Sequence, residues 1–467
     1  MTDTDPGRGQ KWGILIAVGI GTFMTALDTS VVNTVLPVIG QNFNEPITSV
    51  EWIITIYLLV LSGLLLTFGR LGDIRGHKVS FITGFLVFMG GSFFSGAAPS
   101  VPFLVASRGL QALGGAMIAA NSPAILTKNF PAEQRGQALG LQATMTYLGL
   151  TAGPSLGGFL ATLLGWRVVF YINLPVGLAT ILLSRHFIPV DRNHEVREPF
   201  DYAGAATFML GLGALLLGLN QGEEWGWTSL AILALLSFAI LLLAVFVVIE
   251  SRVAHPMLDL SLFKGLSFSL TTTSAVINYI GVFSAIFLMP YFLIQGRGYS
   301  PAEAGLILTA QPVVMAIVAP ISGTLSDRVG TRLPSILGMV VLSVGLFALS
   351  RLSAQSSILS VMEALAIVGF GTGVFISPNN SALMGSAPKS RQGIAAGILA
   401  TARNFGMVLG VGIAGAVYTI GLSHAGSVGA SPQGGAIYLA LKTSFLVASL
   451  IMILGVFTSM VRVVSRS

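Results

Sequence analysis

The chain has 467 residues, of which 54% are hydrophobic and only 9% are charged, against about 25% charged residues in ordinary soluble domains. A water-soluble fold could not bury so much apolar surface, so the composition predicts that the lipid bilayer is the solvent. A net charge of +6 would suggest a nucleic-acid partner for a soluble protein, but here its distribution matters more and we expect no nucleic acid. The absence of cysteine excludes disulfides, thiolate metal sites and cysteine nucleophiles.

Apolar segments long enough to cross a bilayer follow one another along the chain. A membrane-crossing helix needs roughly 20 mostly apolar residues, and about 14 such segments are present. They cover 12–37, 48–69, 79–98, 102–126, 136–161, 167–188, 202–221, 228–250, 267–293, 302–325, 333–351, 356–384, 392–420 and 437–461. We therefore expect an all-α polytopic membrane protein, with lipids as a partner and no soluble domain between the spans.

The basic residues predict the direction of these spans. Most of the 24 Lys and Arg residues fall in loops on the same side as the N-terminus, and the opposite loops hold only Arg167, Arg297 and Arg351. Loops rich in Lys and Arg stay in the cytoplasm. The expected location is the cell membrane, plasma or inner, with multiple passes and both termini in the cytoplasm.

The two halves of the chain contain related sequences. The segment Gly69–Lys78 recurs in altered form at Gly323–Arg332. Four glycines at 136, 140, 149 and 153 recur with the same internal spacing at 393, 397, 406 and 410. Such copies are typical of transporters in which two bundles move about a central site. We expect a six-helix bundle over 1–190, a linker and inserted two-helix hairpin over 191–264, and a second six-helix bundle over 265–467.

The repeated loops are candidates for a cytoplasmic latch that controls conformation. An anion is favoured beside the N-terminal amides of a helix, and the neighbouring basic residues could pair across the bundle interface or with anionic lipid. The alternative is a plain positive-inside loop with glycine turns, which would suffice for one copy; two copies at matching positions favour the latch. The residues assigned to this latch are Gly69, Asp73, Arg75, Gly76, Lys78, Asp327, Arg328 and Arg332.

Ionisable residues inside the spans are the candidates for proton coupling, because burying them in a membrane is costly. Asp28, Arg108 and Glu363 are assigned to this role, since a carboxyl exposed alternately to two sides can take up and release a proton. The alternative is that Asp28 or Glu363 only pairs with Arg108 or Arg403 to hold helices together. Glu51 and Lys442 lie near span ends and are interpreted mostly as interfacial anchors.

A substrate cavity between the bundles would be lined by apolar, aromatic and amide side chains, many of which could equally be core or lipid-facing residues. The candidates are Phe23, Met24, Asn33, Tyr57, Met117, Tyr147, Asn278, Phe283, Arg403 and Phe405. Gly149, Gly153 and Gly157 fall on one helix face with small-xxx-small spacing, which lets helix backbones approach closely. No phosphate-binding loop, metal-ligand spacing or nucleophile–base arrangement is visible, so we expect no enzyme, metal or cofactor.

These motifs together resemble the major facilitator superfamily over nearly the whole chain, and specifically its 14-helix drug:proton antiporter branch. Gly69–Lys78 is similar to the cytoplasmic signature loop of that superfamily, with departures at Ile74 and His77. The remaining matches are Leu27–Pro37 in the first helix, Arg108–Gly114 in the fourth, Gly149–Gly158 in the fifth and Trp166–Pro175 before the sixth.

The resemblance implies the major facilitator fold with two bundles, alternating access, and Asp28 as a proton- or cation-binding carboxyl. It also implies that Arg108 takes part in proton transfer and that Glu363 belongs to the second bundle's share of the cavity. The fifth-helix motif, with Gly149, Gly153, Pro154, Gly157 and Gly158, is associated in that family with antiporters rather than importers.

We therefore expect a proton-coupled antiporter that exports small lipophilic, cationic drugs or toxic compounds and functions as a monomer. Its partners would be a small-molecule substrate and protons as the coupling ion. The alternatives are a narrow-specificity metabolite transporter on the same fold and a non-transporting membrane sensor.

Overall fold

The computed structural model describes residues 8–189, 201–253, 256, 260–387, 392–427 and 435–461, and the side chains of some helix residues in these ranges lie outside the description. The described residues form helices and no strand. The helices are α1 (Arg8–Phe43), α2 (Ile47–Val50), α3 (Trp52–Arg75), α4 (His77–Gly96), α5 (Val101–Asn129), α6 (Ala132–Leu164), α7 (Val168–Tyr171), α8 (Asn173–Phe187), α9 (Tyr202–Trp225), α10 (Leu230–Arg252), η1 (Leu260–Lys264), α11 (Leu266–Pro290), η2 (Tyr291–Gly296), α12 (Pro301–Leu308), α13 (Ala310–Val329), α14 (Arg332–Ser350), α15 (Ile358–Ser386), α16 (Gln392–Ser427) and α17 (Gly435–Val461).

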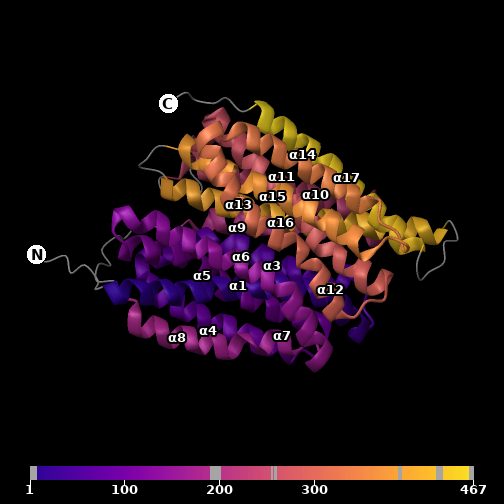
Figure 1. Ribbon diagram of the computed structural model, residues 1–467, viewed down its shortest axis with the longest axis horizontal. Helices are drawn as coiled ribbons and strands as arrows, with labels where there is room; N and C mark the ends of the chain where they lie inside the picture. Colours follow the sequence, from indigo (N-terminus) through magenta and orange to yellow (C-terminus); the bar gives the residue numbers. More distant parts are fainter. Residues whose placement is uncertain are drawn as a thin grey trace, which may run out of the picture.

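Fourteen helical segments in the described residues are long and apolar enough to cross a membrane, which confirms the expected all-α polytopic fold. Some spans contain breaks: α2 and α3 share the second span, and α12 and α13 share the tenth. Figure 1 shows α1 and α3–α8 on one side of the molecule and α11 and α13–α17 on the other, with α12 reaching toward the first half. The division of the chain at residues 190 and 264 stays a prediction.

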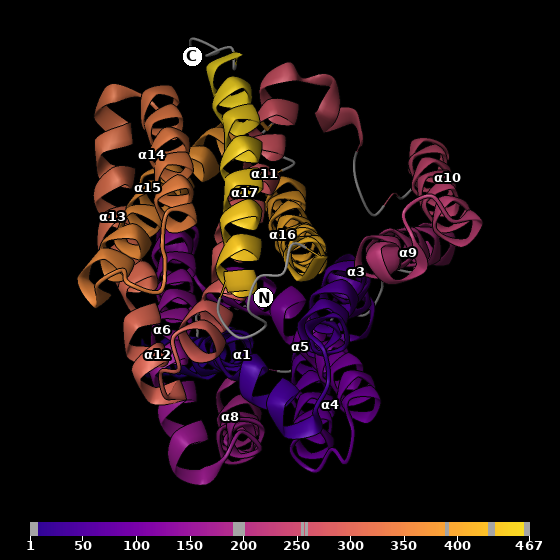
Figure 2. The same ribbon diagram turned by 90° about the vertical axis from the view of Figure 1, so that its right-hand side faces the viewer.

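The hairpin α9–α10 lies on the flank of the molecule, beside α3 (Figure 2). Its helix α9 contacts α3 of the first half and α16 of the second half. Met209 packs against Gly63 of α3, and Leu216 packs against Gly412 of α16. Helix α10 exposes large apolar side chains that water would not favour, such as Leu230 and Ile240, so its outer face suits lipid.

Glycine lets α6 pack closely against α1, and the same arrangement is present in the second half. A Cβ atom at Gly149 would lie 2.5 Å from the Phe23 carbonyl oxygen of α1. In the second half, a Cβ atom at Gly406 would lie 2.5 Å from the Val276 carbonyl oxygen of α11. Because no larger residue fits at such distances, the repeated glycines have the same packing role in both halves.

The two halves meet tightly at one end of the molecule, where α6 packs against α12. A Cβ atom at Gly158 would overlap the carbonyl of Pro301, and one at Gly305 would overlap the carbonyl of Pro154. The hydroxyls of Ser155 and Thr309 lie 2.5 Å apart across this contact. We call it the closed end; it lies opposite the start of α1 (Figure 1).

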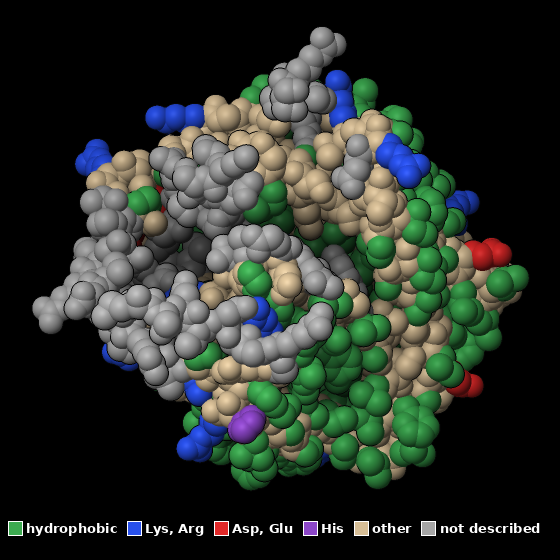
Figure 3. Space-filling view, turned by 60° about the vertical axis from the view of Figure 1, so that its left-hand side comes forward, with side chains coloured by type: hydrophobic (Ala, Val, Ile, Leu, Met, Phe, Trp, Pro, Cys, Tyr) green, Lys and Arg blue, Asp and Glu red, His purple; other side chains and the backbone are tan. Residues whose placement is uncertain are grey.

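The other end of the molecule is hollowed. Figure 3 looks toward the side from which α1 begins and shows a depression between groups of side chains, with Lys and Arg side chains on the surrounding surface. The two halves are thus in close contact at the closed end, and the described surface is hollowed at the opposite end.

A larger residue at Gly158 should separate the two halves at the closed end. Overpacking costs about 1–3 kcal/mol, which is enough to raise the population of an opened form by about tenfold. Because the chain has no cysteine, Thr309→Cys would carry the sole thiol. We expect a maleimide to label this thiol about tenfold faster in the Gly158→Val background than without that change.

Gly90→Val is the matched control, because a Cβ atom at this helical glycine meets nothing within 4 Å. Equal labelling rates in the two valine backgrounds would show that the glycine contact does not hold the closed end together.

Candidate functional site

Asp28 and Arg108 form a buried ion pair in the first half. Asp28 lies on α1 and Arg108 on α5, and Nη1 of Arg108 is 2.5 Å from Oδ2 of Asp28. The other carboxylate oxygen of Asp28 accepts hydrogen bonds from Gln111 at 2.9 Å and from Asn173 of α8 at 2.8 Å. The side chains of the pair are at most 1% exposed. The structure therefore brings two of the three predicted coupling residues together.

The Arg108 guanidinium makes further contacts within the first half. Its Nε donates to the Ile53 carbonyl at 3.3 Å, and its Cζ lies 4.1 Å from the centroid of the Tyr57 ring. Ser92 of α4 accepts hydrogen bonds from both Gln111 and Asn173. Such contacts offset much of the cost of removing two charges from water. The network joins α1, α3, α4, α5 and α8 around one pair of opposite charges.

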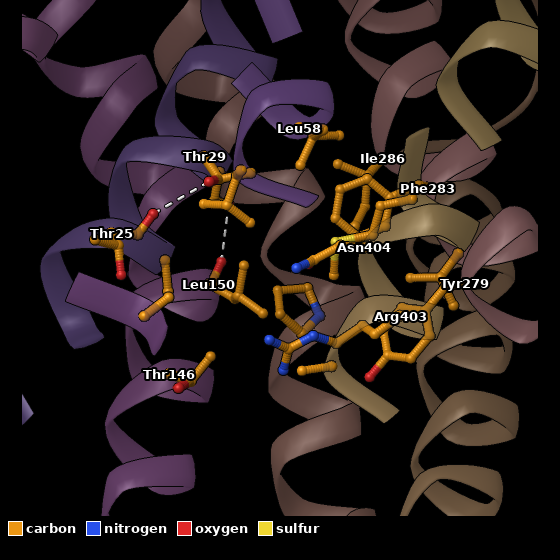
Figure 4. Close-up of a pocket in the computed structure, with 18 of the residues that line it drawn as sticks. Thr25, Thr29, Leu58, Thr146, Leu150, Tyr279, Phe283, Ile286, Arg403 and Asn404 are labelled. Atoms are coloured by element: carbon orange, nitrogen blue, oxygen red, sulfur yellow. Dashed lines mark hydrogen bonds between the residues drawn. The ribbon is translucent and has the colours of Figure 1, made fainter. Parts of the chain in front are cut away.

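A pocket with a volume of about 390 Å³ lies between the two halves, within the size range of small-molecule sites. Figure 4 shows residues of both halves facing each other across it. Its lining comes from α1, α3, α5, α6, α11, α12, α13, α15 and α16 and includes Thr22, Thr25, Thr29, Asn33, Tyr57, Leu58, Gln142, Thr146, Leu150, Tyr279, Phe283, Ile286, Gln311, Asn380, Arg403, Asn404 and Met407.

The ion pair and the pocket lie on two sides of the same helix. Thr29 and Ser30, the residues that follow Asp28, line the pocket, whereas the Asp28 carboxyl points into the first half. Tyr57 belongs to both sites, because it lines the pocket and lies against the Arg108 guanidinium. A change of charge at Asp28 would therefore act on groups that border the pocket.

Four of the predicted cavity residues line the pocket: Asn33, Tyr57, Phe283 and Arg403. Phe23, Met24, Met117, Asn278 and Phe405 are not among its lining residues, and the Tyr147 side chain lies outside the described ones. Phe23 and Met24 do not line the pocket because helical periodicity turns them away from the side of α1 that carries Thr22, Thr25 and Thr29. Asn278 is fully buried and contacts the sulfur of Met339 within the second half.

Two carboxyls lie in surroundings that differ from those expected. Glu363 was expected in the second bundle's share of the cavity, but it is exposed in the second turn of α15 and does not line the pocket. Glu51 was interpreted as an interfacial anchor, but it is only 1% exposed. Its Oε2 lies against Gly415 of α16 and has no hydrogen-bond partner among the described residues. Contacts from the opposite half explain this burial.

The repeated loops bind within their own halves through two of their basic residues. Lys78 donates to the carbonyls of Arg185 at 3.0 Å and Ile188 at 2.5 Å, at the end of α8. Arg332 donates to the Met460 carbonyl at the end of α17. A cation is favoured at a helix C-terminus, where carbonyl groups lack partners. The same device thus stabilises the last helix of each half.

Gly76 and Gly330 take positive φ angles of 96° and 83° at matching positions of the two loops, a conformation that favours glycine. Of the other latch residues, Gly69 lies on α3, and Arg75 and Arg328 are exposed. The side chains of Asp73 and Asp327 lie outside the described ones. A latch between the halves therefore stays a prediction.

The proposed antiporter motif is a packing surface on α6. Gly149, Gly153 and Gly157 face α1, where they meet Phe23, Ser30 and Val31. Gly158 faces α12, as described above. Pro154 borders the pocket, so the motif touches the first helix, the opposite half and the pocket together.

Several polar residues of the site were not predicted from the sequence. Thr22, Thr25 and Thr29 continue the predicted Asn33 into a polar stripe on one face of α1, and their spacing of three or four residues was a signal that could have revealed it. Ser92 and Asn404 carried no such local signal, because single polar residues in apolar helices often satisfy their own backbone.

Fourteen spans, two packed halves and a pocket between them define a polytopic membrane transporter. A sequence model of the Major Facilitator Superfamily matches residues 18–273 and 271–466, and the chain belongs to this family. The family consists of transporters, so the chain is not an enzyme.

Its relatives include proteins named for drug resistance and for transport of a metabolite. It is 33% identical over 410 residues to the multidrug resistance protein Stp of Mycobacterium tuberculosis (strain ATCC 25618 / H37Rv), covering 88% of this chain and 76% of Stp. It is 33% identical to the riboflavin transporter RibZ of Clostridioides difficile (strain 630), covering 89% of this chain and 90% of RibZ. It is 31% identical to the tetracenomycin C resistance and export protein of Streptomyces glaucescens, covering 87% of this chain and 76% of that protein.

The fold is also similar to that of a solved transporter. This is a bacterial homologue of the human lysosomal transporter Spinster, in an inward-facing and unoccupied conformation. The TM-score is 0.71 with 15% sequence identity, covering 98% of this chain and 97% of the other. At this identity the similarity concerns the fold alone.

Removing the two charges of the Asp28–Arg108 pair together should cost less stability than the two single removals added together. Asp28→Asn or Arg108→Gln leaves a buried charge without its partner, which costs about 3–5 kcal/mol. The double variant should lose less stability than the sum of the two single variants. Thermal unfolding of the purified proteins in detergent, followed by tryptophan fluorescence, measures the three losses. Additive losses would contradict a direct interaction.

Glu51→Gln should have a much smaller effect than Asp28→Asn, although both changes replace a buried carboxyl by an amide. Glu51 has no ion-pair partner to lose among the described residues, so its variant should stay within about 1 kcal/mol of the parent or become more stable. The same unfolding measurement tests this. A loss as large as that of Asp28→Asn would mean that Glu51 is needed in its ionised form.

Proposed function

We propose that this protein is a proton-coupled antiporter that exports small lipophilic compounds by alternating access. The observation that carries the proposal is the buried Asp28–Arg108 pair, which lies on the opposite side of α1 from the pocket. Ionisable residues inside a membrane are costly and mark proton relays and substrate pathways. The relatives named for multidrug resistance and for export support the choice of substrate class and direction.

Protonation of Asp28 is the proposed coupling step. It removes the negative charge that Arg108 binds, so the guanidinium keeps Gln111 and the Ile53 carbonyl as partners but loses its counter-charge. The free energy of this change depends on how α1 and α5 are placed. A conformation that restores a partner to Arg108 or admits water to it is then favoured, which is the differential interaction that a coupled transporter needs.

Alternating access would use the contact between α6 and α12. In the conformation described above this end is closed by glycine packing, and the pocket lies between the halves. The similar solved transporter is described as inward-facing. We propose that the hollow end faces the cytoplasm, that both termini lie there, and that the protein works as a monomer in the cell membrane with lipids around it.

One proton supplies enough energy for useful export. A charge that crosses a potential of 100 mV yields about 2.3 kcal/mol, and a tenfold concentration gradient of a neutral solute costs about 1.4 kcal/mol. A one-to-one exchange could therefore sustain an outward gradient.

The test uses purified protein in liposomes with an imposed pH gradient and a panel of lipophilic dyes, including ethidium. We expect gradient-driven accumulation of at least one dye, lost in Asp28→Asn. Glu45→Gln is the matched control, because Glu45 is an exposed carboxyl between helices and its change should leave accumulation unaltered. Liposomes with the Glu363→Gln variant should also accumulate dye, since Glu363 is exposed and outside the pocket.

Accumulation in Asp28→Asn equal to that of the parent would overturn the coupling role of Asp28. Failure of every dye to respond to the gradient would overturn proton-coupled export of lipophilic compounds. Loss of dye accumulation with Glu363→Gln would show that Glu363 is needed for coupling, as the sequence predicted.

A second candidate function is transport of a narrow range of metabolites. It is favoured by the similarity to the riboflavin transporter RibZ, which covers about nine tenths of both chains, and by the many hydroxyl and amide groups of the pocket. Riboflavin is fluorescent, so the same liposomes can test it. Movement of riboflavin without movement of any lipophilic dye would favour this candidate.

A further inference from the structure

The described residues that line the pocket carry a net positive charge. Arg403 of α16 is the one charged side chain in that lining, and Asp28 is turned away from it into the first half. Figure 4 shows the Arg403 side chain extending across the pocket toward Thr146 and Leu150 of α6. A lipophilic cation would find no described carboxylate in this lining and would be repelled by the guanidinium.

Unused hydrogen-bond donors gather at the same place. The Nε of Arg403 and the Nδ2 of Asn404 are buried and have no hydrogen-bond partner among the described residues. Buried polar groups are normally paired, and leaving one unpaired is costly. Two neighbouring donors without acceptors therefore indicate a site that a ligand with acceptor atoms would complete.

The rest of the lining limits the shape of such a ligand. Tyr279 and Phe283 of α11 lie beside Arg403 and Asn404, with Ile286 and Leu58 further along the pocket (Figure 4). Aromatic side chains bind flat apolar ring systems well. On the opposite wall, α1 presents the polar stripe of Thr22, Thr25 and Thr29. The pocket thus combines an aromatic wall, a cationic donor group and a row of hydroxyls.

We infer that the pocket selects planar aromatic compounds that carry an anionic acceptor group, such as a carboxylate, phenolate or enolate, bound by Arg403 and Asn404. Charge-assisted hydrogen bonds of this kind are shorter and stronger than neutral ones, and arginine is suited to planar acceptor groups. The inference names the substrate class for the transport activity proposed above and rests on it. It replaces the expectation of a cationic substrate.

Equilibrium binding of two dyes to the purified protein in detergent tests the inference without any proton gradient. Fluorescein and rhodamine 123 share a xanthene scaffold, but at mildly alkaline pH fluorescein is a dianion and rhodamine 123 is a cation. Fluorescence anisotropy should show fluorescein binding at least about tenfold more tightly, the effect of one charge-assisted contact.

Three variants locate the effect. Arg403→Gln should weaken fluorescein binding by about tenfold and leave rhodamine 123 binding unchanged or stronger. Arg403→Lys keeps the charge but not the planar guanidinium group, so its affinity for fluorescein should lie between those of the parent and Arg403→Gln. Arg351→Gln removes the charge of an exposed residue outside the pocket and is the matched control, which should bind as the parent does. Thermal unfolding confirms that each variant is folded.

Equal affinity for the two dyes, or no fluorescein binding, would overturn the inference, as would fluorescein binding that is unchanged in a folded Arg403→Gln protein. If Arg403→Gln does not fold, Arg403→Lys decides in its place, with unchanged binding counting against the planar contact. Binding that follows these expectations without gradient-driven transport would retain the substrate class and reject proton coupling, so the two proposals fail separately.

Discussion

The buried pair of Asp28 and Arg108 is the interaction on which the arrangement of the first half depends. Two charges in an apolar interior are tolerated only if their remaining hydrogen-bonding groups are satisfied. Gln111, Asn173 and Ser92 meet that requirement, which fixes the positions of α4, α5 and α8 around α1. The pocket then forms on the other side of α1, where the threonine stripe faces the second half. A single electrostatic requirement thus positions both the proposed proton site and one wall of the pocket.

Close backbone packing is the second constraint. The glycines of α6 let it approach α1 on one side and α12 on another, so the same helix belongs to the rigid core of its half and to the contact between halves. Among the described residues, polar contacts such as that of Ser155 with Thr309 supplement this close packing. Packing of this kind is lost abruptly when helices separate, because dispersion contacts fall off steeply with distance. The closed end is therefore suited to two distinct positions rather than a continuous range.

The fold could be predicted largely from the sequence, because membrane spans are read from length and hydrophobicity alone. The repeat was also visible, since Gly76 and Gly330 need positive φ angles and the glycines of α6 and α16 need close packing in both halves. The site was harder to predict. Asp28 and Arg108 were recognised because charges in spans are rare, but their pairing depends on the spatial relation of α1 and α5. Glu51 and Glu363 show the limit: their distance from a span end did not reveal that the opposite half covers one and leaves the other exposed.

The hairpin α9–α10 belongs to neither half of the repeat, yet α9 touches α3 on one side and α16 on the other. If the halves rock as proposed above, at least one of these two contacts must slide or the hairpin must travel with its partner. Its outer helix α10 carries large apolar side chains outward, so any such travel also displaces neighbouring lipid. The thickness and lateral pressure of the surrounding bilayer would thereby contribute to the free energy of that movement through these two helices.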